Sequence, residues 1–234
     1  MKKSNLVLAS YFTSQPDPQK NLFWKADINR LYPLIDSVIK KNEKIIIFHD
    51  CFDNTHDIKN CEFIRTLPNP YFVPTVARWE IYLDYLSVNS KRIKNVFCVD
   101  STDVQMLNNP FPFINLDILY CGSEYQWKVG DRWLQKRKKN INILDYDNVL
   151  DENKNNVMLN AGIVGGHVLL VKDFLEKLTD LHNSNSKKVR KSLDMPIFNY
   201  CVMKYFPNNY VTGDIVHTPY RRKITQSSSW WKHK

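Results

Sequence analysis

The sequence predicts one α/β domain in which helices cover both faces of a mostly parallel sheet. Short apolar runs alternate with segments of helical periodicity over the first hundred residues, which is the pattern of consecutive βαβ units. Several of these runs end abruptly in polar or acidic residues, as buried parallel strands do at the edge of a sheet. With 234 residues, 43% of them hydrophobic, the chain is long enough to bury a substantial core.

The first half of the chain supplies four predicted strands and two predicted helices. Each strand is a run of apolar residues, and each helix shows apolar residues recurring every three or four positions. Pro33 is tolerated because it falls in the first turn of its helix. In chain order, the expected elements are strand 5–12, helix 28–39, strand 44–50, strand 62–67, helix 79–86 and strand 95–99.

The alternation weakens after residue 110. A strand is expected at 116–124, and the polar, basic stretch 126–157 is expected to be mostly loop with a short helix. The small residues of LNAGIVGG, 159–166, predict a strand or turn that another backbone can approach closely. No linker or internal repeat divides the chain, so one domain is expected over 1–226, followed by a basic and aromatic tail at 227–234.

Two helices close the predicted fold. The first has apolar residues at helical spacing between 171 and 181. The second covers 193–206, where Asp194 is expected as the N-cap and Pro196 falls in the first turn. Helices in these positions would complete the cover of the sheet.

Composition limits the classes of function. The net charge is +9, with basic clusters at 136–139, 187–191 and 221–223, and it favours a nucleic acid, an anionic membrane or a phosphate-bearing substrate. A solvated surface explains any single cluster equally well. Five cysteines without a CxxC spacing argue against a zinc cluster or a disulfide scaffold. No apolar run reaches the ~20 residues needed to cross a bilayer, and we expect a cytoplasmic protein.

The stretch VFCVDSTDVQML, 96–107, places Asp100 and Asp103 at the end of a predicted strand. In open α/β sheets, ligands bind at the carboxyl ends of strands. Two carboxylates there can share Mg²⁺ or Mn²⁺, which commonly bridges to substrate phosphates. On spacing alone, Asp-x-x-Asp is also a turn in which one Asp caps the next helix.

Four segments, DSTDVQMLNNPF, LNAGIVGG, LDMPIFNY and IVHTPYRRK, resemble nucleotide-sugar-dependent glycosyltransferases of the GT-A fold, among them small viral, bacterial and glycogenin-like enzymes. The resemblance covers residues 6–223 and implies a single-domain, Rossmann-like GT-A fold. It implies a DxD motif stretched here to DSTD, with Mn²⁺ or Mg²⁺ as cofactor. Asp103 would be the firmer metal ligand, and Asp100 would face the ribose or the metal. Which of the two binds the metal directly stays open.

The same resemblance assigns the donor-binding residues. Tyr11, Phe12 and Thr13 follow the first strand, where this fold holds base and ribose; Tyr11 would stack on uracil or belong to the core. Arg78 takes a position that holds the diphosphate or the motif acids, with an exposed structural arginine as the alternative. These residues imply a nucleotide-diphosphate sugar, most simply a UDP-sugar, as donor.

The C-terminal part of the resemblance concerns metal and diphosphate. His217 resembles the C-terminal metal-binding histidine of glycogenin-like enzymes, with a structural histidine as the alternative. The Lys-Pro-Trp that usually follows is absent. Arg221, Arg222 and Lys223 would then supply the diphosphate contacts.

Further residues are assigned to the reacting sugar and the acceptor. Asn160, Ala161 and Gly162 would lie beneath the transferred sugar. Asp194 would be the general base of an inverting transfer or would contact sugar hydroxyls in a retaining one. Glu124 is a candidate for acceptor binding or loop structure. The acceptor implied is a glycan or a lipid-linked hydroxyl.

The sequence therefore predicts a metal-dependent hexosyltransferase, with a sugar nucleotidyltransferase and a non-catalytic nucleic-acid-binding module as the alternatives. A sugar nucleotidyltransferase would carry a glycine-rich loop after the first strand, but ASYFTSQPDP contains no glycine. A nucleic-acid-binding module would explain the charge but not acids at strand ends, which repel phosphate unless a metal intervenes. The tail SSSWWKHK is expected to be a lid, an interfacial anchor touching a membrane, or a packed or frayed terminus.

Overall fold

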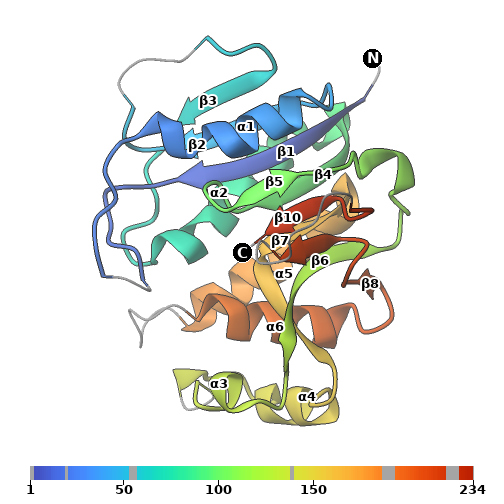
Figure 1. Ribbon diagram of the computed structural model, residues 1–234. Coiled ribbons are helices and arrows are strands. Elements are labelled where there is room, and N and C mark those ends of the chain that lie inside the picture. The colour runs from blue at the N-terminus through green and yellow to red at the C-terminus, as the bar shows by residue number, and fades with distance from the viewer. Residues whose placement is uncertain are drawn as a thin grey trace.

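The computed structural model describes residues 3–18, 21–52, 57–137, 140–185, 193–219 and 227–233. They form a seven-stranded, mostly parallel sheet with helices on both faces, and a second sheet of three short strands (Figure 1). The strands are β1 (Ser4–Tyr11), β2 (Ile45–His49), β3 (Cys61–Arg65), β4 (Ile93–Val99), β5 (Val104–Met106), β6 (Leu119–Lys128), β7 (Val157–His167), β8 (Tyr210–Val211), β9 (His217–Pro219) and β10 (Trp231–His233). The α-helices are α1 (Tyr32–Ile39), α2 (Pro74–Asn89), α3 (Arg132–Gln135), α4 (Tyr146–Glu152), α5 (Val168–Asn185) and α6 (Asp194–Tyr205).

The strand order of the large sheet creates a switch point. Its order is β3-β2-β1-β4-β7-β6-β8, so the chain builds outward from β1 in one direction and then resumes on the other side of it with β4. β3, β2, β1 and β4 pair in parallel, whereas β7 is antiparallel to both β4 and β6. β6 therefore runs in the same direction as β4. A crevice outside the carboxyl ends of β1 and β4 is the expected place for a ligand.

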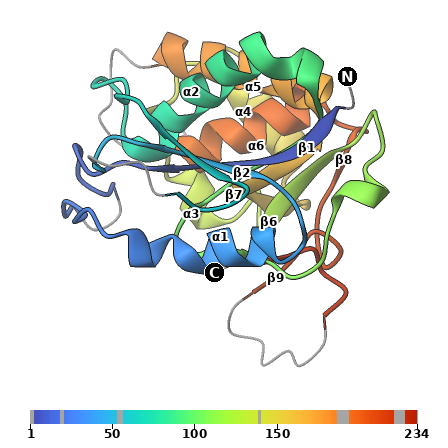
Figure 2. The ribbon, with the colours of Figure 1, turned by 90° about the horizontal axis from the view of Figure 1, so that it is seen from above.

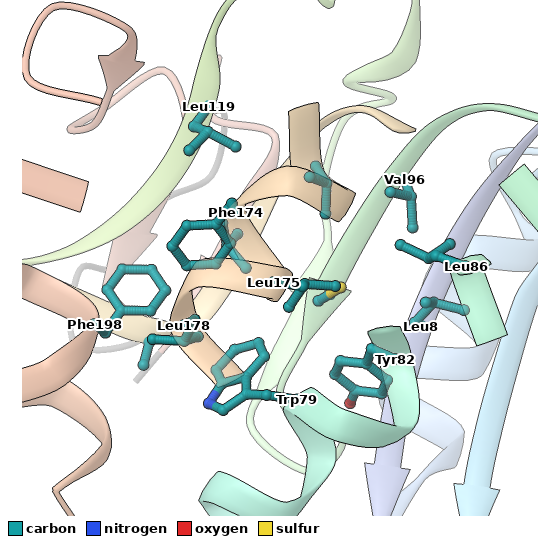
Figure 3. Packing of buried hydrophobic residues seen from close by; sticks show 14 of the residues in the cluster. Leu8, Trp79, Tyr82, Leu86, Val96, Leu119, Phe174, Leu175, Leu178 and Phe198 are labelled. Atoms are coloured by element: carbon teal, nitrogen blue, oxygen red, sulfur yellow. The ribbon is translucent and has the colours of Figure 1, made fainter. Parts of the chain in front are cut away.

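Two hydrophobic layers hold the helices to the large sheet. Helices α2, α5 and α6 cover one face and α1 covers the other (Figure 2). On the first face, Trp79 and Phe174 pack around Phe198, with ring centroids 6.2 and 5.3 Å from it, above Leu8 and Val96 of the sheet (Figure 3). Each such side chain contributes about 1.5–3 kcal/mol when fully buried.

Residues 157–167 form a central strand. Glycine is required within it, because a Cβ on Gly165 would lie 2.2 Å from a ring carbon of Phe97. The close approach of β7 to β4 explains why this strand is so rich in small residues. In the stretch before it, expected to be mostly loop with a short helix, β6 continues to Lys128 and two short helices, α3 and α4, lie between loop segments.

The segment predicted as a tail is part of the fold. β10 lies between β5 and β9, antiparallel to the first and parallel to the second. Trp231 lies 5.3 Å from the ring of Phe97, and Trp230 lies 5.0 Å from that of Tyr120. Both indoles are buried. Of the three expectations for this segment, the packed terminus is the one observed, and these indoles are not available to insert into a membrane.

None of the helices in the described ranges combines the length and the apolar character that a bilayer-spanning segment needs.

His182 gives the fold a measurable pH dependence. It is buried on α5 against Phe72, and its Nε2 has no hydrogen-bond partner among the described residues. Burial lowers its pKa to about 3, and the charge of Arg78 acts in the same direction. A histidine whose pKa falls on folding stabilises the fold above its unfolded pKa of about 6.5, and this stabilisation is lost as the pH falls.

We therefore expect wild-type protein to lose about 2 kcal/mol of unfolding free energy through His182 between pH 7 and pH 5. His182→Leu removes the titrating group and the unpaired nitrogen together, so the variant should lose correspondingly less stability over this interval. Urea unfolding at pH 7, 6 and 5 measures the difference. Equal losses in both proteins would show that His182 is not held neutral by the fold.

Candidate metal centre and ligand pocket

A pocket of about 310 Å³ opens at the carboxyl ends of β1 and β4, the switch point of the sheet. This volume is at the lower end of the range of small-molecule sites. Three parts of the chain form its walls: the end of β1 with the loop that follows it, the first turns of α2, and the loop after β4. The lining residues are Ser10, Tyr11, Phe12, Asp17, Pro18, Trp24, Arg30, Pro74, Thr75, Arg78 and residues 100–103.

At one end of this pocket, Asp100 and Asp103 meet His233. One ligand atom from each of the three residues lies within 4.8 Å of the others. His233 Nε2 is 3.7 Å from Asp100 Oδ2 and 4.0 Å from Asp103 Oδ1. The small sheet sets this arrangement, because His233 on β10 pairs with Val104 on β5, the residue after Asp103. Two carboxylates and an imidazole at this spacing can hold a divalent cation.

In this Asp–Asp–His cluster, the acids and the histidine each favour the charged form of the other. Burial alone would raise the pKa of Asp100, but the Arg78 guanidinium and His233 outweigh it and hold that pKa well below its usual range. Burial would lower the pKa of His233, yet Asp100 and Asp103 raise it above its ordinary value. The cluster therefore already contains an ionised carboxylate, which is the form that binds a cation.

Gly162 lies directly beneath the cluster. A Cβ at this position would be 2.5 Å from His233 Cε1 and 2.7 Å from Asp100 Oδ2. The backbone N–H of Gly162 donates to Asn160 Oδ1 at 2.6 Å, and its carbonyl accepts from Asp100 N at 2.9 Å. The resemblance to GT-A enzymes implied a place for this residue beneath the transferred sugar. The structure places it where only a glycine leaves room for the cluster.

Arg78 connects the cluster to the core. It is 5% exposed, not the exposed arginine considered as an alternative. Nη1 donates to Asp100 Oδ1, while Nη2 donates to Ala161 O at 2.9 Å and to Asp194 Oδ2 at 3.2 Å. Burial would lower the pKa of this guanidinium, but the two carboxylates raise it. One buried cation thus joins the end of β4, the middle of β7 and the start of α6.

Asp194 is not the N-cap predicted for α6. Leu193 takes that position without a side-chain capping bond, and Asp194 is the first helical residue. Its carboxylate is turned inward, where Oδ1 accepts from Trp79 Nε1 at 2.8 Å and Oδ2 accepts from Arg78. Burial raises its pKa to about 6, although Arg78 and Trp79 act in the opposite direction. An ion pair with a buried arginine replaces the local capping bond. Pro196 does fall in the first turn, as expected.

His217 is close to the cluster but does not join it. Its Nε2 accepts a hydrogen bond from Ser123 N at 2.8 Å, so this nitrogen's lone pair is used within the fold. Its ring centroid is 6.0 Å from that of His233. The histidine that meets the two acids is His233, which sequence reasoning missed. The sequence offered one indication of it, namely that the segment WWKHK contains a histidine in addition to His217.

The remaining sugar-facing candidates lie around the same edge. Asn160 Nδ2 donates to Glu124, and Asn160 Oδ1 holds the backbone of Gly162. Ala161 is buried and contributes its carbonyl to Arg78. Segment 160–162 therefore builds the floor of the site through its backbone.

The residues after β1 divide between core and pocket. Tyr11 is buried and stacks on Phe52, with centroids 5.9 Å apart and planes at 6°, yet it also lines the pocket. Phe12 belongs to the core of the opposite face. Thr13 N donates to Asp50 Oδ1 at 2.8 Å, which fixes the loop. Arg221, Arg222 and Lys223 lie outside the described residues.

The aromatic end of the pocket includes a residue that the sequence did not single out. Trp24 lines the pocket, makes an edge contact with the Tyr11 ring at 6.0 Å, and carries the Arg30 guanidinium 3.4 Å above its own ring. Its Nε1 donates to Asp17 Oδ2 at 3.1 Å. The pocket thus has a flat aromatic end and a carboxylate-rich end.

Neither a family model nor a curated protein sequence matches this chain.

The space beneath the cluster can be tested by Gly162→Ala. The added methyl group must displace His233 or Asp100, and overpacking of this kind costs about 1–3 kcal/mol. Because His233 is on β10, we expect faster hydrogen exchange in 230–233, together with the loss of stability. Ala161→Gly, which changes the neighbouring residue by one methyl in the opposite direction, is the control for general damage to β7. Unchanged exchange in β10 of Gly162→Ala would contradict the close packing.

Proposed function

We propose that this protein is a metal-dependent glycosyltransferase of GT-A type. It would transfer a sugar from a nucleotide-diphosphate donor, most simply a UDP-sugar, to a hydroxyl of a glycan or a lipid-linked acceptor. One observation carries the proposal: the Asp100–Asp103–His233 cluster adjoins a pocket at the switch point of a mostly parallel α/β sheet. Sequence resemblance to GT-A enzymes points to the same chemistry.

The cluster fits Mn²⁺ or Mg²⁺ by the chemistry of its donors. Two carboxylate oxygens suit either ion, and an imidazole nitrogen favours Mn²⁺ over Mg²⁺. Three protein ligands leave further coordination positions for substrate oxygens. Asp100, Asp103 and His233 would hold the ion, and when bound it would neutralise the diphosphate as it leaves. His233 replaces His217 as the imidazole ligand in this proposal.

The pocket suits a nucleotide in shape and polarity. Its aromatic end, with Tyr11 and Trp24, offers ring surfaces to a base, and its other end brings Asp100 and Asp103 to the diphosphate side. Stacking of a base on an aromatic ring is worth about 1–3 kcal/mol. Each ring has one covered face, Tyr11 by Phe52 and Trp24 by the Arg30 guanidinium, so the opposite face of each is the candidate stacking surface.

Arg78 and Asp194 are both buried next to the acids of the cluster, and each would have its own role. Arg78 lines the pocket and directs one oxygen of Asp100 away from the cluster, which leaves Oδ2 toward His233. Asp194 is not among the pocket-lining residues and contacts Arg78 and Trp79. Two roles are open to it: general base, with a pKa of about 6 that suits proton transfer near neutral pH, or anchor for Arg78.

Metal dependence is the first expected property. UDP should bind at least tenfold more weakly, a loss of about 1.4 kcal/mol or more, when chelator replaces Mn²⁺. Asp103→Ala and His233→Ala should each produce a similar loss, because each removes one ligand. Isothermal titration calorimetry measures Mn²⁺ and UDP binding separately, and a panel of nucleotide sugars scored for hydrolysis identifies the donor.

Two variants serve as matched controls. Asp117→Ala removes an exposed acid at the amino end of β6, and His217→Ala removes the histidine that lies outside the cluster. Both should keep Mn²⁺ affinity. Tight UDP binding in excess chelator, unaltered in Asp103→Ala, would remove the metal from the proposal.

Asp194→Asn separates the two roles of Asp194. An amide cannot take a proton, so a general-base role predicts that kcat falls by about 10²–10⁴-fold while donor affinity barely changes. An anchoring role predicts a different outcome: the amide NH₂ would oppose Arg78, and breaking a buried ion pair costs about 3–5 kcal/mol of stability. Thermal unfolding, UDP titration and steady-state kinetics on one preparation distinguish them. A fully active and stable variant would exclude both roles.

A further inference from the structure

Large apolar side chains are exposed on the loops around the pocket. Leu22 and Phe23, in the loop after β1, are 65% and 67% exposed. Leu67 and Tyr71, in the loop after β3, are 79% and 80% exposed. Both loops leave the same edge of the sheet, because β1 and β3 run in the same direction.

The two loops are connected to each other and to the pocket. Gln15 Nε2 donates to Asn69 O at 3.2 Å, which links the loop after β1 to the loop after β3. Trp24 and Pro74, which flank the exposed side chains in sequence, line the pocket. The exposed apolar residues therefore lie on loops that leave the edge of the sheet where the pocket opens. Exposed apolar residues gathered beside a ligand site often mark an interaction surface.

A basic corner lies on the same side of the sheet, beyond the level at which β4 ends. β6 runs in the same direction as β4, so its last residues leave the sheet on that side. A tight turn follows, in which Asp131 N donates to Lys128 O, and it leads into α3 (Figure 1). Lys128, Arg132 and Lys136 are exposed, and their side chains form no ion pair with any residue in the described ranges. Trp127, beside them, is 46% exposed. Glu124 precedes Trp127 by three residues on β6, which is about 10 Å along the strand.

We propose that this edge of the sheet, formed by the two apolar loops and the basic corner, docks on an anionic lipid bilayer. A bilayer offers anionic headgroups to the three cations and an interfacial layer to the indole and the apolar loops, so one partner accounts for both sets of side chains. A nucleic acid would engage the cations but would leave Leu22, Phe23 and Leu67 without a role. Attachment would be peripheral.

Docking does not depend on sugar transfer and is measured without a nucleotide sugar. If the proposed function also holds, the pocket opens at the bilayer surface. That placement favours a lipid-linked acceptor over a free glycan, and this last step alone rests on the proposed function.

The test is co-sedimentation of the full chain with vesicles of phosphatidylcholine containing about 30% phosphatidylglycerol, against phosphatidylcholine alone. We expect binding to the anionic vesicles, at least tenfold weaker binding to the neutral ones, and loss of binding as salt is raised. The triple variant Lys128→Glu/Arg132→Glu/Lys136→Glu and the double variant Phe23→Ser/Tyr71→Ser should each weaken binding at least tenfold. All five positions are exposed, and a thermal melt confirms that the variants fold.

Two control variants carry the same chemical change at the opposite edge. Lys91→Glu/Arg92→Glu/Lys94→Glu reverses three exposed cations at the start of β4, and Val88→Ser/Leu116→Ser removes two exposed apolar side chains there. Both should bind vesicles as wild type does. The proposal is overturned if anionic vesicles are not bound, if each control loses as much binding as its partner variant, or if a single-stranded RNA oligonucleotide binds the same cations and displaces the vesicles.

Discussion

The structure depends above all on one buried cation. The Arg78 guanidinium lies between two carboxylates from different parts of the chain, Asp100 at the end of β4 and Asp194 at the start of α6, and also bonds the Ala161 carbonyl on β7. Without it, Asp194 would be an uncompensated charge among Trp79 and the aromatic core. Removing one partner of a buried pair typically costs about 3–5 kcal/mol. The same contact fixes the rotamer of Asp100, so the core and the candidate metal centre share a constraint.

The parts of the fold that could be predicted are those set by local pattern. Strands β1, β2 and β4 are continuous apolar runs, and the faces of α2 and α5 repeat every three or four residues, so their positions follow from burial alone. The acids after β4 were also predictable, because a buried strand that ends in Asp100 must leave that carboxylate at the sheet edge. The resemblance to GT-A enzymes named the motif acids among the contacts of Arg78, and Arg78 does bond Asp100. It named Gly162 as well, but not the contact of Gly162 with His233.

The rest depends on contacts between distant segments. Asp194 has the sequence of an N-cap, yet Arg78 competes for its carboxylate more strongly than the backbone N–H groups of its own helix. His217 and His233 are the same residue type at the same edge; only the pairing of β10 with β5 decides which of them reaches the acids. Short strands such as β10 carry little periodicity, and the burial of Trp230 and Trp231 cannot be inferred from two adjacent indoles.

The insertion of β10 between β5 and β9 has a consequence for how the protein matures. The contacts that place His233 beside Asp103 join segments far apart in the sequence, and contacts of this kind form late because a long chain must first be closed into a loop. Arg78 and Asp100, which are near each other in sequence, can associate earlier. A newly synthesised chain would therefore pass through a folded stage that has its acids in place but lacks the imidazole. Under the proposed function, the metal site would be complete only after β10 has docked, so the amount of protein and the amount of metal-competent protein would be separate quantities during synthesis.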